Sequence, residues 1–278
     1  MILTHSDFRT TSLLSAIRFC SVVVLAMTSV STFNTARAET VLITGSNRGI
    51  GLEFAKQYAG RGWIVIATHR RNTPPETLTA LAETYPDQVR VEQMDVSDQE
   101  QILALAEQLK GMPIDVILNN AALTSSFEDT TKHTFGTLDH SQFSRWMAVN
   151  AHGPLMVSEA FIENVKASKQ KKIVSITSLL SSFGRNLGRP GKFYWDKASK
   201  VALNAVMFNL AHDLRNDGVI VALVSPGIVR VEKTMHLPRM PRQIDMSVSV
   251  DGLLAVIGQL TIEQTGSFTR YNGEPVPF

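Results

Sequence analysis

The sequence predicts an α/β fold, in which a doubly wound parallel sheet is covered by helices on both faces. Short apolar runs alternate with helical stretches from residue 40 to the end of the 278-residue chain. The runs are nearly continuous, as in strands that are buried on both faces. A glycine-rich turn joins the first run to the first helix. No linker or internal repeat interrupts this pattern, so we expect a single domain.

The elements are expected in a regular order along the chain. "TVLIT" at 40–44 is the first strand, and 52–62 is a helical stretch that ends at glycine. Later strands are expected at 63–68, 89–96, 115–120, 172–177 and 219–226, and later helices at 74–86, 98–109, 139–165 and 197–215. Right-handed crossovers between such strands give the doubly wound order. The stretches 124–140 and 230–250 have no clear periodicity, and we expect them to form loops over the active site.

The first 38 residues differ from the rest in composition. They contain three arginines and one acid, then the apolar run "FCSVVVLAM", and they end in Ala36-Arg37-Ala38. This form is typical of a secretory signal peptide, and the run is short for a membrane span. We therefore predict a signal peptide over 1–38, a mature domain over 39–278 and an exported or periplasmic location. A misassigned start codon before a cytoplasmic protein, an uncleaved anchor and an organelle transit peptide remain alternatives.

Charge and cysteine content limit the possible partners. Cleavage after Ala38 would take the formal charge from +2 to 0 and remove Cys20, the single cysteine. No basic run indicates nucleic acid binding. The seven histidines are scattered and form no metal-ligand pattern. We therefore predict no metal, no nucleic acid partner and no membrane span after cleavage.

The turn "TGSNRGIG" follows the first strand and opens a helix. Its glycines allow a tight turn and close backbone approach, and the helix N-terminus offers free N–H groups to a pyrophosphate. A plain strand-to-helix turn is the alternative. We assign dinucleotide binding to Gly45, Asn47, Arg48, Gly49, Ile50 and Gly51.

The second strand ends in "ATHRRN". An acid at this place usually holds the ribose hydroxyls of NAD, whereas arginine accommodates a 2′-phosphate. His69, Arg70 and Arg71 therefore predict NADP(H) rather than NAD, with help from Arg48. Two arginines at a strand end are also compatible with simple solvation.

Many short motifs in one order carry a family resemblance. They are "TGSNRGIGLEFAKQY", "MDVSD", "DVILNNAA", "VNAHGPL", "KIVSITS", "KASKVALN", "SPGIVR" and "GSFTRYNGEPVPF". On these, the chain over 40–278 resembles the short-chain dehydrogenases/reductases, and more narrowly a carbonyl-reductase-like subgroup related to the bacterial C-factor proteins. The resemblance implies a Rossmann fold and NAD(P)-dependent oxidoreduction.

The resemblance also implies a site. Asn150 would hold a water in a proton relay, Ser178 would bind the substrate carbonyl, and Lys200 would bind the nicotinamide ribose. Taken singly, a serine at a strand end or an asparagine in a helix has an ordinary structural role. The cofactor would further contact Asp95 and Val96 at the adenine, Asn119 and Ala121 after the fourth strand, and Pro226, Gly227 and Ile228 at the nicotinamide.

The proton donor of that family is missing from its usual place. The family has a tyrosine four residues before the lysine, and here that position is Asp196, with Tyr194 two residues earlier. Aspartate, with an ordinary pKa of about 3.9, would need a rise of about three units to stay protonated at pH 7. A cationic Lys200 opposes that rise, so we expect an Asp196–Lys200 ion pair. Tyr194 points elsewhere on a regular helix and would need a local bulge.

Two functions follow from this pattern. The first is an NADP(H)-dependent oxidoreductase that acts on a small carbonyl or alcohol, with Asp196 or Tyr194 as the acid. The alternative is a catalytically impaired binding or interaction protein on the same fold, because the fold alone does not define an activity. The helix after Lys200 is apolar nearly all round, which predicts a core helix. Either a monomer or a homodimer is compatible with this.

Overall fold

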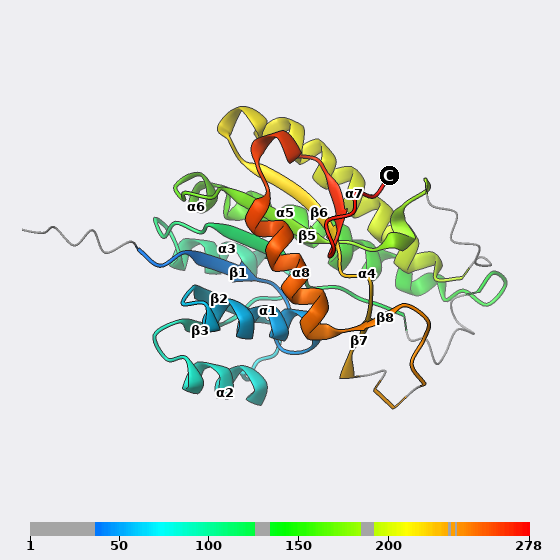
Figure 1. Cartoon of the computed structure of the whole chain (residues 1–278), viewed down its shortest axis with the longest axis horizontal. Coiled ribbons are helices and arrows are strands. Elements are labelled where there is room, and N and C mark those ends of the chain that lie inside the picture. Colours follow the sequence, from blue (N-terminus) through cyan, green and yellow to red (C-terminus); the bar gives the residue numbers. More distant parts are fainter. Residues whose placement is uncertain (1–36, 126–133, 185–191, 233–234, 237) are drawn as a thin grey trace, which may run out of the picture. The chain divides into compact units, whose positions relative to one another are not determined.

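The computed structural model describes residues 37–125, 134–184, 192–232, 235–236 and 238–278 (Figure 1). All but the last two residues of the predicted signal peptide lie outside the described residues. Residues 37–278 form one compact unit. Across the described ranges, no helix has the length and hydropathy that crossing a bilayer requires.

One sheet of seven strands organises the described part of the chain. Its order is β3-β2-β1-β4-β5-β6-β9, and every neighbouring pair is parallel. The strands are β1 (Thr40–Ile43), β2 (Ile64–His69), β3 (Val89–Gln93), β4 (Val116–Asn119), β5 (Lys172–Ile176), β6 (Ile220–Ser225) and β9 (Phe268–Arg270). The chain winds outward from β1 in both directions, which confirms the predicted doubly wound α/β fold.

Helices cover both faces of this sheet (Figure 1). The α-helices are α1 (Gly49–Gly60), α2 (Glu76–Thr84), α3 (Gln99–Gln108), α4 (Phe143–Met147), α5 (Gly153–Ala160), α6 (Ile162–Lys166), α7 (Tyr194–Leu214) and α8 (Met246–Gln259). Side chains of α1, α2 and α8 pack in one hydrophobic cluster, and those of α3, α5 and α7 in the other. Each cluster therefore fills one side of the sheet.

Strand β1 shows how the sequence builds these two clusters. Val41 and Ile43 belong to the cluster beneath α1 and α8, whereas Leu42 belongs to the cluster on the opposite face. Successive strand side chains point to opposite faces, so a strand between two helical layers must be apolar at every position. This explains the continuous apolar runs in the sequence.

The predicted helix over 139–165 is divided in the structure. It contains α4, a π turn η3 (Ala148–His152), α5 and α6, after a short 3₁₀ turn η2 (His140–Gln142). Pro154 lies in the first turn of α5 and has no N–H for the carbonyl of Asn150. The helix opens into a π turn at this point, a feature that is frequent at functional sites.

The predicted loop over 230–250 has more structure than expected. It contains the end of β7 (Ile228–Arg230), all of β8 (Gln243–Asp245), which pairs with β7, and the start of α8. Strands of three residues are too short to show a periodicity of two. Of the other predicted loop, residues 126–133 lie outside the described part, and Thr134 forms a β-bridge with Lys192.

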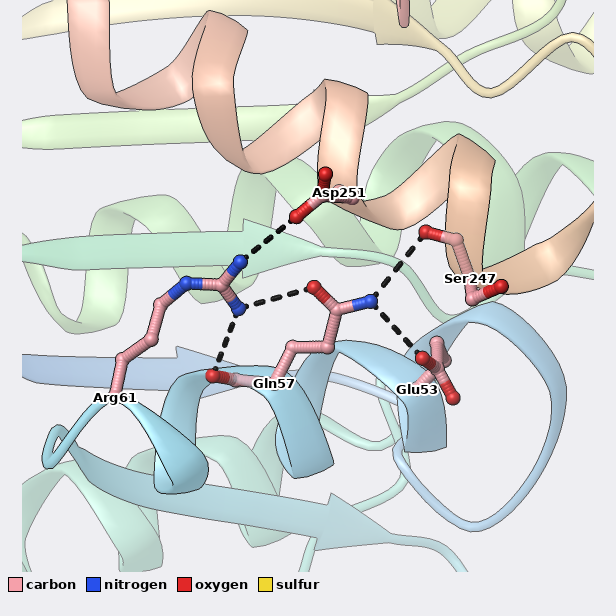
Figure 2. Close-up of polar contacts among 5 residues, drawn as sticks. All are labelled: Glu53, Gln57, Arg61, Ser247 and Asp251. Carbon is pink, nitrogen blue, oxygen red and sulfur yellow. Dashed lines mark hydrogen bonds and ion pairs between the residues drawn. The ribbon is translucent and has the colours of Figure 1, made fainter.

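Polar side chains join α1 to α8 at the surface (Figure 2). Gln57 donates to Glu53 Oε1 at 2.9 Å and to the carbonyl of Ser247 at 3.4 Å. Arg61 pairs with Asp251 at 2.9 Å and also donates to Gln57. Exposed pairs of this kind add little stability, so the hydrophobic cluster shared by α1 and α8 contributes more to their packing.

Candidate active site

The glycine turn lies at the carboxyl edge of the sheet, where the strands end. Gly45 has φ +68°, and a Cβ there would stand 2.9 Å from the Cα of Ala121. A Cβ on Gly51 would collide with the carbonyl oxygen of Gly45 and with the side chain of Asn120. The turn therefore requires glycine at both positions, and Ala121 packs directly behind it.

Two residues that sequence reasoning missed hold this turn to the end of β4. Asn120 Nδ2 donates to the carbonyls of Thr44, at 2.9 Å, and of Gly45, at 3.2 Å. Thr44 Oγ1 accepts from the amides of Asn120 and Ala121, both at 2.9 Å. In the sequence, these two residues are the threonine directly before the turn and the second asparagine of "NNAA", and these positions could have indicated the contact.

The N-terminus of α1 faces out of this turn. Arg48 is exposed at the N-cap position and makes no side-chain cap. The carbonyl of Asn47 accepts from Thr77 Oγ1 at 2.8 Å, and Ile50 is half-buried. The amide of Gly49 donates to Glu232 Oε1 at 3.2 Å. Glu232 was not predicted, because nothing in its local sequence indicates a contact with this turn.

His69, Arg70 and Arg71 at the end of β2 differ in their exposure to solvent. His69 is buried, and burial lowers its pKa, so its imidazole is neutral at pH 7. No residue in the described ranges forms a hydrogen bond with its buried Nδ1. Arg70 and Arg71 are exposed, so these two side chains carry the positive charge at this strand end.

The predicted adenine residues follow β3. Asp95 Oδ1 accepts from the amide and hydroxyl of Ser97, at 2.9 and 2.7 Å, so the carboxylate stabilises its own loop. Val96 is buried, and a Cβ on Gly153 would stand 2.6 Å from its carbonyl oxygen. The loop after β3 thus packs closely on the start of α5, and the adenine contact stays a prediction.

Asn119 ends β4 inside the protein. Its Nδ2 donates to Ser158 Oγ at 3.2 Å, with longer contacts to Pro154 O and Ser175 Oγ at 3.4 Å. Its Oδ1 is buried, and the part of the chain that the structure describes supplies no donor to it. A buried carbonyl oxygen without a donor is unusual, because leaving one costs roughly 1–3 kcal/mol.

Asn150 ties together three parts of the site. Within the π turn, its Oδ1 accepts from the amide of Leu123 at 2.7 Å. Its Nδ2 donates to the carbonyl of Leu123 at 3.0 Å and to Ser199 Oγ at 2.9 Å. Asn150 therefore holds the loop after β4 against the start of α7.

Lys200 is buried between α7 and β5. Its Nζ donates to the carbonyl of Ile176 at 2.7 Å. Burial lowers the pKa of Lys200 to about 8, against the opposing attraction of Asp196. The expected ion pair with Asp196 does not form among the described residues, because each group has another close partner. The expectation considered only positions on one helix, whereas both partners come from other elements.

Asp196 contacts the loop after β4. Its Oδ1 accepts from the amide of Ser125 at 3.0 Å, and its Oδ2 accepts from the hydroxyl of Ser125. Ser199 Oγ donates to the carbonyl of Asp196 at 3.2 Å. With the bonds of Asn150, these contacts form a closed ring that holds the loop after β4. Ser125 was missed because its neighbours show no motif.

Ser178 follows β5 and begins the 3₁₀ turn η4 (Leu179–Ser181). Its Oγ accepts from the amide of Leu180 at 3.2 Å, so the serine does cap this turn. A hydroxyl that accepts one bond still has its proton to donate. The side chain is half-buried beside the end of the sheet.

Tyr194 is the first residue of α7 and is 36% exposed. The helix runs without a bulge from Tyr194 to Leu214, after Phe193 in the left-handed conformation at φ +62°. Tyr194 and Lys200 are six residues apart, which places them about a third of a turn out of register. The bulge that would bring Tyr194 onto the face of Lys200 is absent from α7.

The residues expected at the nicotinamide follow β6. The carbonyl of Pro226 accepts from Ser249 Oγ at 2.7 Å, which ties this segment to α8. Gly227 has φ +80°, and Ile228 begins β7. The segment therefore turns sharply at the carboxyl edge, where β6 lies beside β5, the strand that precedes Ser178.

Comparisons with known proteins agree with this geometry. The family model for short chain dehydrogenase matches residues 39–242. A 1-hydroxy-2-glutathionyl-2-methyl-3-butene dehydrogenase of a Rhodococcus species is 32% identical over 84% of this chain and 97% of its own. The C-signal protein of Myxococcus xanthus is 30% identical over 60% of this chain and 93% of its own. Both relatives come from bacteria.

A solved structure adds a cofactor to the comparison. The NADPH-bound carbonyl reductase from chicken fatty liver matches with a TM-score of 0.78 and 26% identity, over 87% of this chain and 100% of its own. The chain belongs to the short-chain dehydrogenase/reductase family, as the sequence motifs indicated. It is accordingly an oxidoreductase of that type.

Proposed function

We propose that the protein reduces a small carbonyl compound to an alcohol with NADPH, in a reversible reaction. One observation supports the proposal: Asn150 bonds to Ser199, the neighbour of Lys200, and Lys200 bonds to Ile176, two residues before Ser178. The NADPH-bound carbonyl reductase of the same fold supports the choice of substrate class and cofactor.

The residues present fit an NADP-type cofactor. Among the described residues, a Cβ on Gly49 would meet only Glu232 within 4 Å, so the described part of the chain leaves room above the first residue of α1. His69, at the end of β2, and Asn119, at the end of β4, each have a buried atom to which no described residue is bonded, and β2 and β4 flank β1. The exposed Arg70 would pair with a 2′-phosphate, which NAD lacks.

The bound cofactor would supply the hydride, and side chains of the chain would manage the substrate oxygen. The hydroxyl of Ser178 would donate to the carbonyl oxygen and favour the charge that develops there. The ammonium of Lys200 keeps N–H groups that no described residue accepts, and these would hold the nicotinamide ribose. The turn 45–51 would bind the pyrophosphate.

The proton for the alcohol would come from Asp196 or Tyr194. Asp196 stands on the same face as Lys200 but would have to release Ser125. Tyr194 has the phenol of the usual donor, but its side chain would have to move by about a third of a turn around the axis of α7 to reach the face of Lys200. The variants Asp196→Asn and Tyr194→Phe distinguish them, because only the loss of the true donor slows proton transfer and alters the pH dependence of kcat.

The first test is binding and turnover by the purified chain. Titration with NADPH and NADH should give at least tenfold tighter binding of NADPH, and a panel of small aldehydes and ketones should show NADPH oxidation. Absence of NADPH binding would contradict the proposal. Binding without turnover would favour the catalytically impaired alternative, and recovery of activity in Asp196→Tyr would then show that only the donor had been lost.

We also infer export and cleavage after Ala38. Arg37 and Ala38 are exposed, and β1 begins at Thr40, so a cut after Ala38 leaves the sheet intact. Glu39 would keep its contacts, because its carbonyl accepts from Ile64 and its carboxylate from Gln170. Intact mass measurement of the protein from its native host should give a chain that begins at Glu39. A chain that retains residues 1–38 would contradict this inference.

A further inference from the structure

Glu232 reaches the glycine turn from the far end of the chain. Its Oε1 accepts the amide proton of Gly49 at 3.2 Å, across a separation of 183 residues. Its Oε2 would stand 3.8 Å from a Cβ on Gly49. Both carboxylate oxygens therefore lie over the first residue of α1.

The first turn of α1 supplies no anion of its own. Arg48 makes no side-chain cap, and no acidic residue occurs in this turn of the helix. Helix N-termini favour negative charge, because their amides are unpaired and the helix dipole is positive there. The carboxylate of Glu232 satisfies this preference in the structure described here.

The same place is needed for the cofactor. The proposed function assigns the pyrophosphate to the turn 45–51, and the amide of Gly49 belongs to that turn. Two anionic groups cannot occupy one amide, and a carboxylate close to a pyrophosphate repels it. Binding of the dinucleotide and the contact between Gly49 and Glu232 therefore exclude each other.

The segment that carries Glu232 can move this side chain without disturbing the core. β7 precedes it and pairs with β8, and Pro226 is tied to α8 through Ser249. Arg230 Nη2 donates to the carbonyl of Met235 at 2.8 Å. The glutamate side chain is exposed, and its release unpacks no buried group.

We propose that Glu232 is an internal competitor of the dinucleotide, whose carboxylate occupies the pyrophosphate position and must leave before the cofactor binds. This inference rests on the proposed function. It makes Glu232 a residue that sets cofactor affinity. It also links cofactor binding to Val231 and Glu232, which directly follow β7.

The test compares NADPH dissociation constants of the full chain and of Glu232→Gln, by fluorescence titration at low and at high salt. The glutamine keeps the size of the side chain and removes its charge. We expect binding at least fivefold tighter in Glu232→Gln, with a smaller gain at high salt, because salt screens the repulsion. Glu159→Gln removes one charge from an exposed site on α5 and should leave the affinity unchanged.

The outcomes separate this inference from the proposed function. Tight NADPH binding by the natural chain with equal affinity in Glu232→Gln would overturn the inference alone. A lower unfolding midpoint in Glu232→Gln with unchanged NADPH affinity would show a structural helix cap and would overturn it as well. Failure of both proteins to bind NADPH would overturn the function and the inference together.

Discussion

Two buried lysines at opposite edges of the sheet show how the protein uses the same side chain differently. Lys172 begins β5 at the amino edge, and its Nζ donates to the carbonyls of Ile257, at 2.8 Å, and Gly258, at 3.2 Å. Lys200 contacts the last residue of the same strand, Ile176, at the carboxyl edge. Burial lowers the pKa of both ammonium groups.

The two lysines differ in how many of their N–H groups are bonded to the described part of the protein. An ammonium has three N–H groups, and Lys172 uses two of them on carbonyls at the end of α8, where the helix dipole favours a cation. Lys200 has one acceptor within the described part of the chain, and its other N–H groups lie at the candidate site. The amino edge thus uses its buried charge to close a helix, whereas the carboxyl edge keeps a buried charge available for a ligand.

Replacing each lysine by methionine tests this contrast and should give the largest effect. Lys200→Met should lower kcat/KM for carbonyl reduction about 100-fold or more, the usual effect of removing a charged group from a reacting site. Lys172→Met should leave kcat/KM unchanged and lower the free energy of unfolding by about 1–3 kcal/mol, because two helix carbonyls lose their donor. Steady-state kinetics and urea denaturation measure both. Equal loss of activity in the two variants would remove the distinction.

Two glycines sharpen the comparison of the edges. Gly51→Ala should destabilise the protein by about 3 kcal/mol and abolish NADPH binding, because its Cβ would collide with Gly45 and Asn120. Gly258→Ala, at the end of α8, meets nothing within 4 Å and should change stability by at most about 1 kcal/mol. Denaturant titrations of both variants provide the measurement. A stable Gly51→Ala that binds NADPH would contradict the tight turn described above.

The pH dependence of stability should report Lys200 directly. Its pKa is about 8 in the folded protein against an ordinary 10.5, so the unfolded chain binds more protons between these values. Stability should therefore rise with pH, by about 2 kcal/mol from pH 7.5 to 9.5. Lys172 contributes with the same sign, whereas burial raises the pKa of Tyr58, which lowers stability above pH 10. The rise should be smaller in Lys200→Met, and an equal rise there would assign it to other groups.

A smaller effect is expected from the arginines at the two edges. Arg70→Ala should weaken NADPH binding about tenfold and leave NADH binding unchanged, since a charge-assisted bond to phosphate contributes roughly 1.5–3 kcal/mol. Arg61→Ala at the amino edge should alter neither constant, because Arg61 contacts Asp251 and Gln57. Calorimetric titration gives both constants. Similar losses for NADPH and NADH in Arg70→Ala would argue against a 2′-phosphate contact.

The smallest effect concerns the loop after β4. Ser125→Ala removes the hydroxyl that donates a hydrogen bond to Asp196. Ser168→Ala removes a hydroxyl that donates to the carbonyl of Val165 at the amino edge. Each should cost about 1 kcal/mol of unfolding free energy. Only Ser125→Ala should also raise KM for the carbonyl substrate, because its loop borders the site. An unchanged KM would mean that this loop does not position substrate.

The sequence predicted what depends on local pattern. Continuous apolar runs located the strands, because both faces of this sheet are covered, and the glycine spacing located the turn after β1. Pro154 was a local signal for the break of the predicted helix over 139–165. The helix α8 was not predicted, because the residues at its start do not alternate between apolar and polar with the period of a helix.

Partners brought together by the fold could not be predicted in this way. Ser125 comes from the loop after β4 and Asp196 from the first turn of α7, and Glu232 reaches Gly49 across most of the chain. The ion pair expected between Asp196 and Lys200 failed for the same reason, since carbonyl and amide groups of other elements compete for both side chains. The chemical roles assigned to Asp196 and Tyr194 remain predictions.

Transfer of deuterium from NADPH that carries deuterium at both C4 positions to a carbonyl substrate is the measurement closest to the proposed reduction. The full chain should be incubated with small aldehydes and ketones, and the alcohol products analysed by mass spectrometry. The account predicts one deuterium in the alcohol for the natural protein and for Lys172→Met, and a rate at least about 100-fold lower for Lys200→Met. NADPH binding by the natural protein with no deuterium in any alcohol would contradict it.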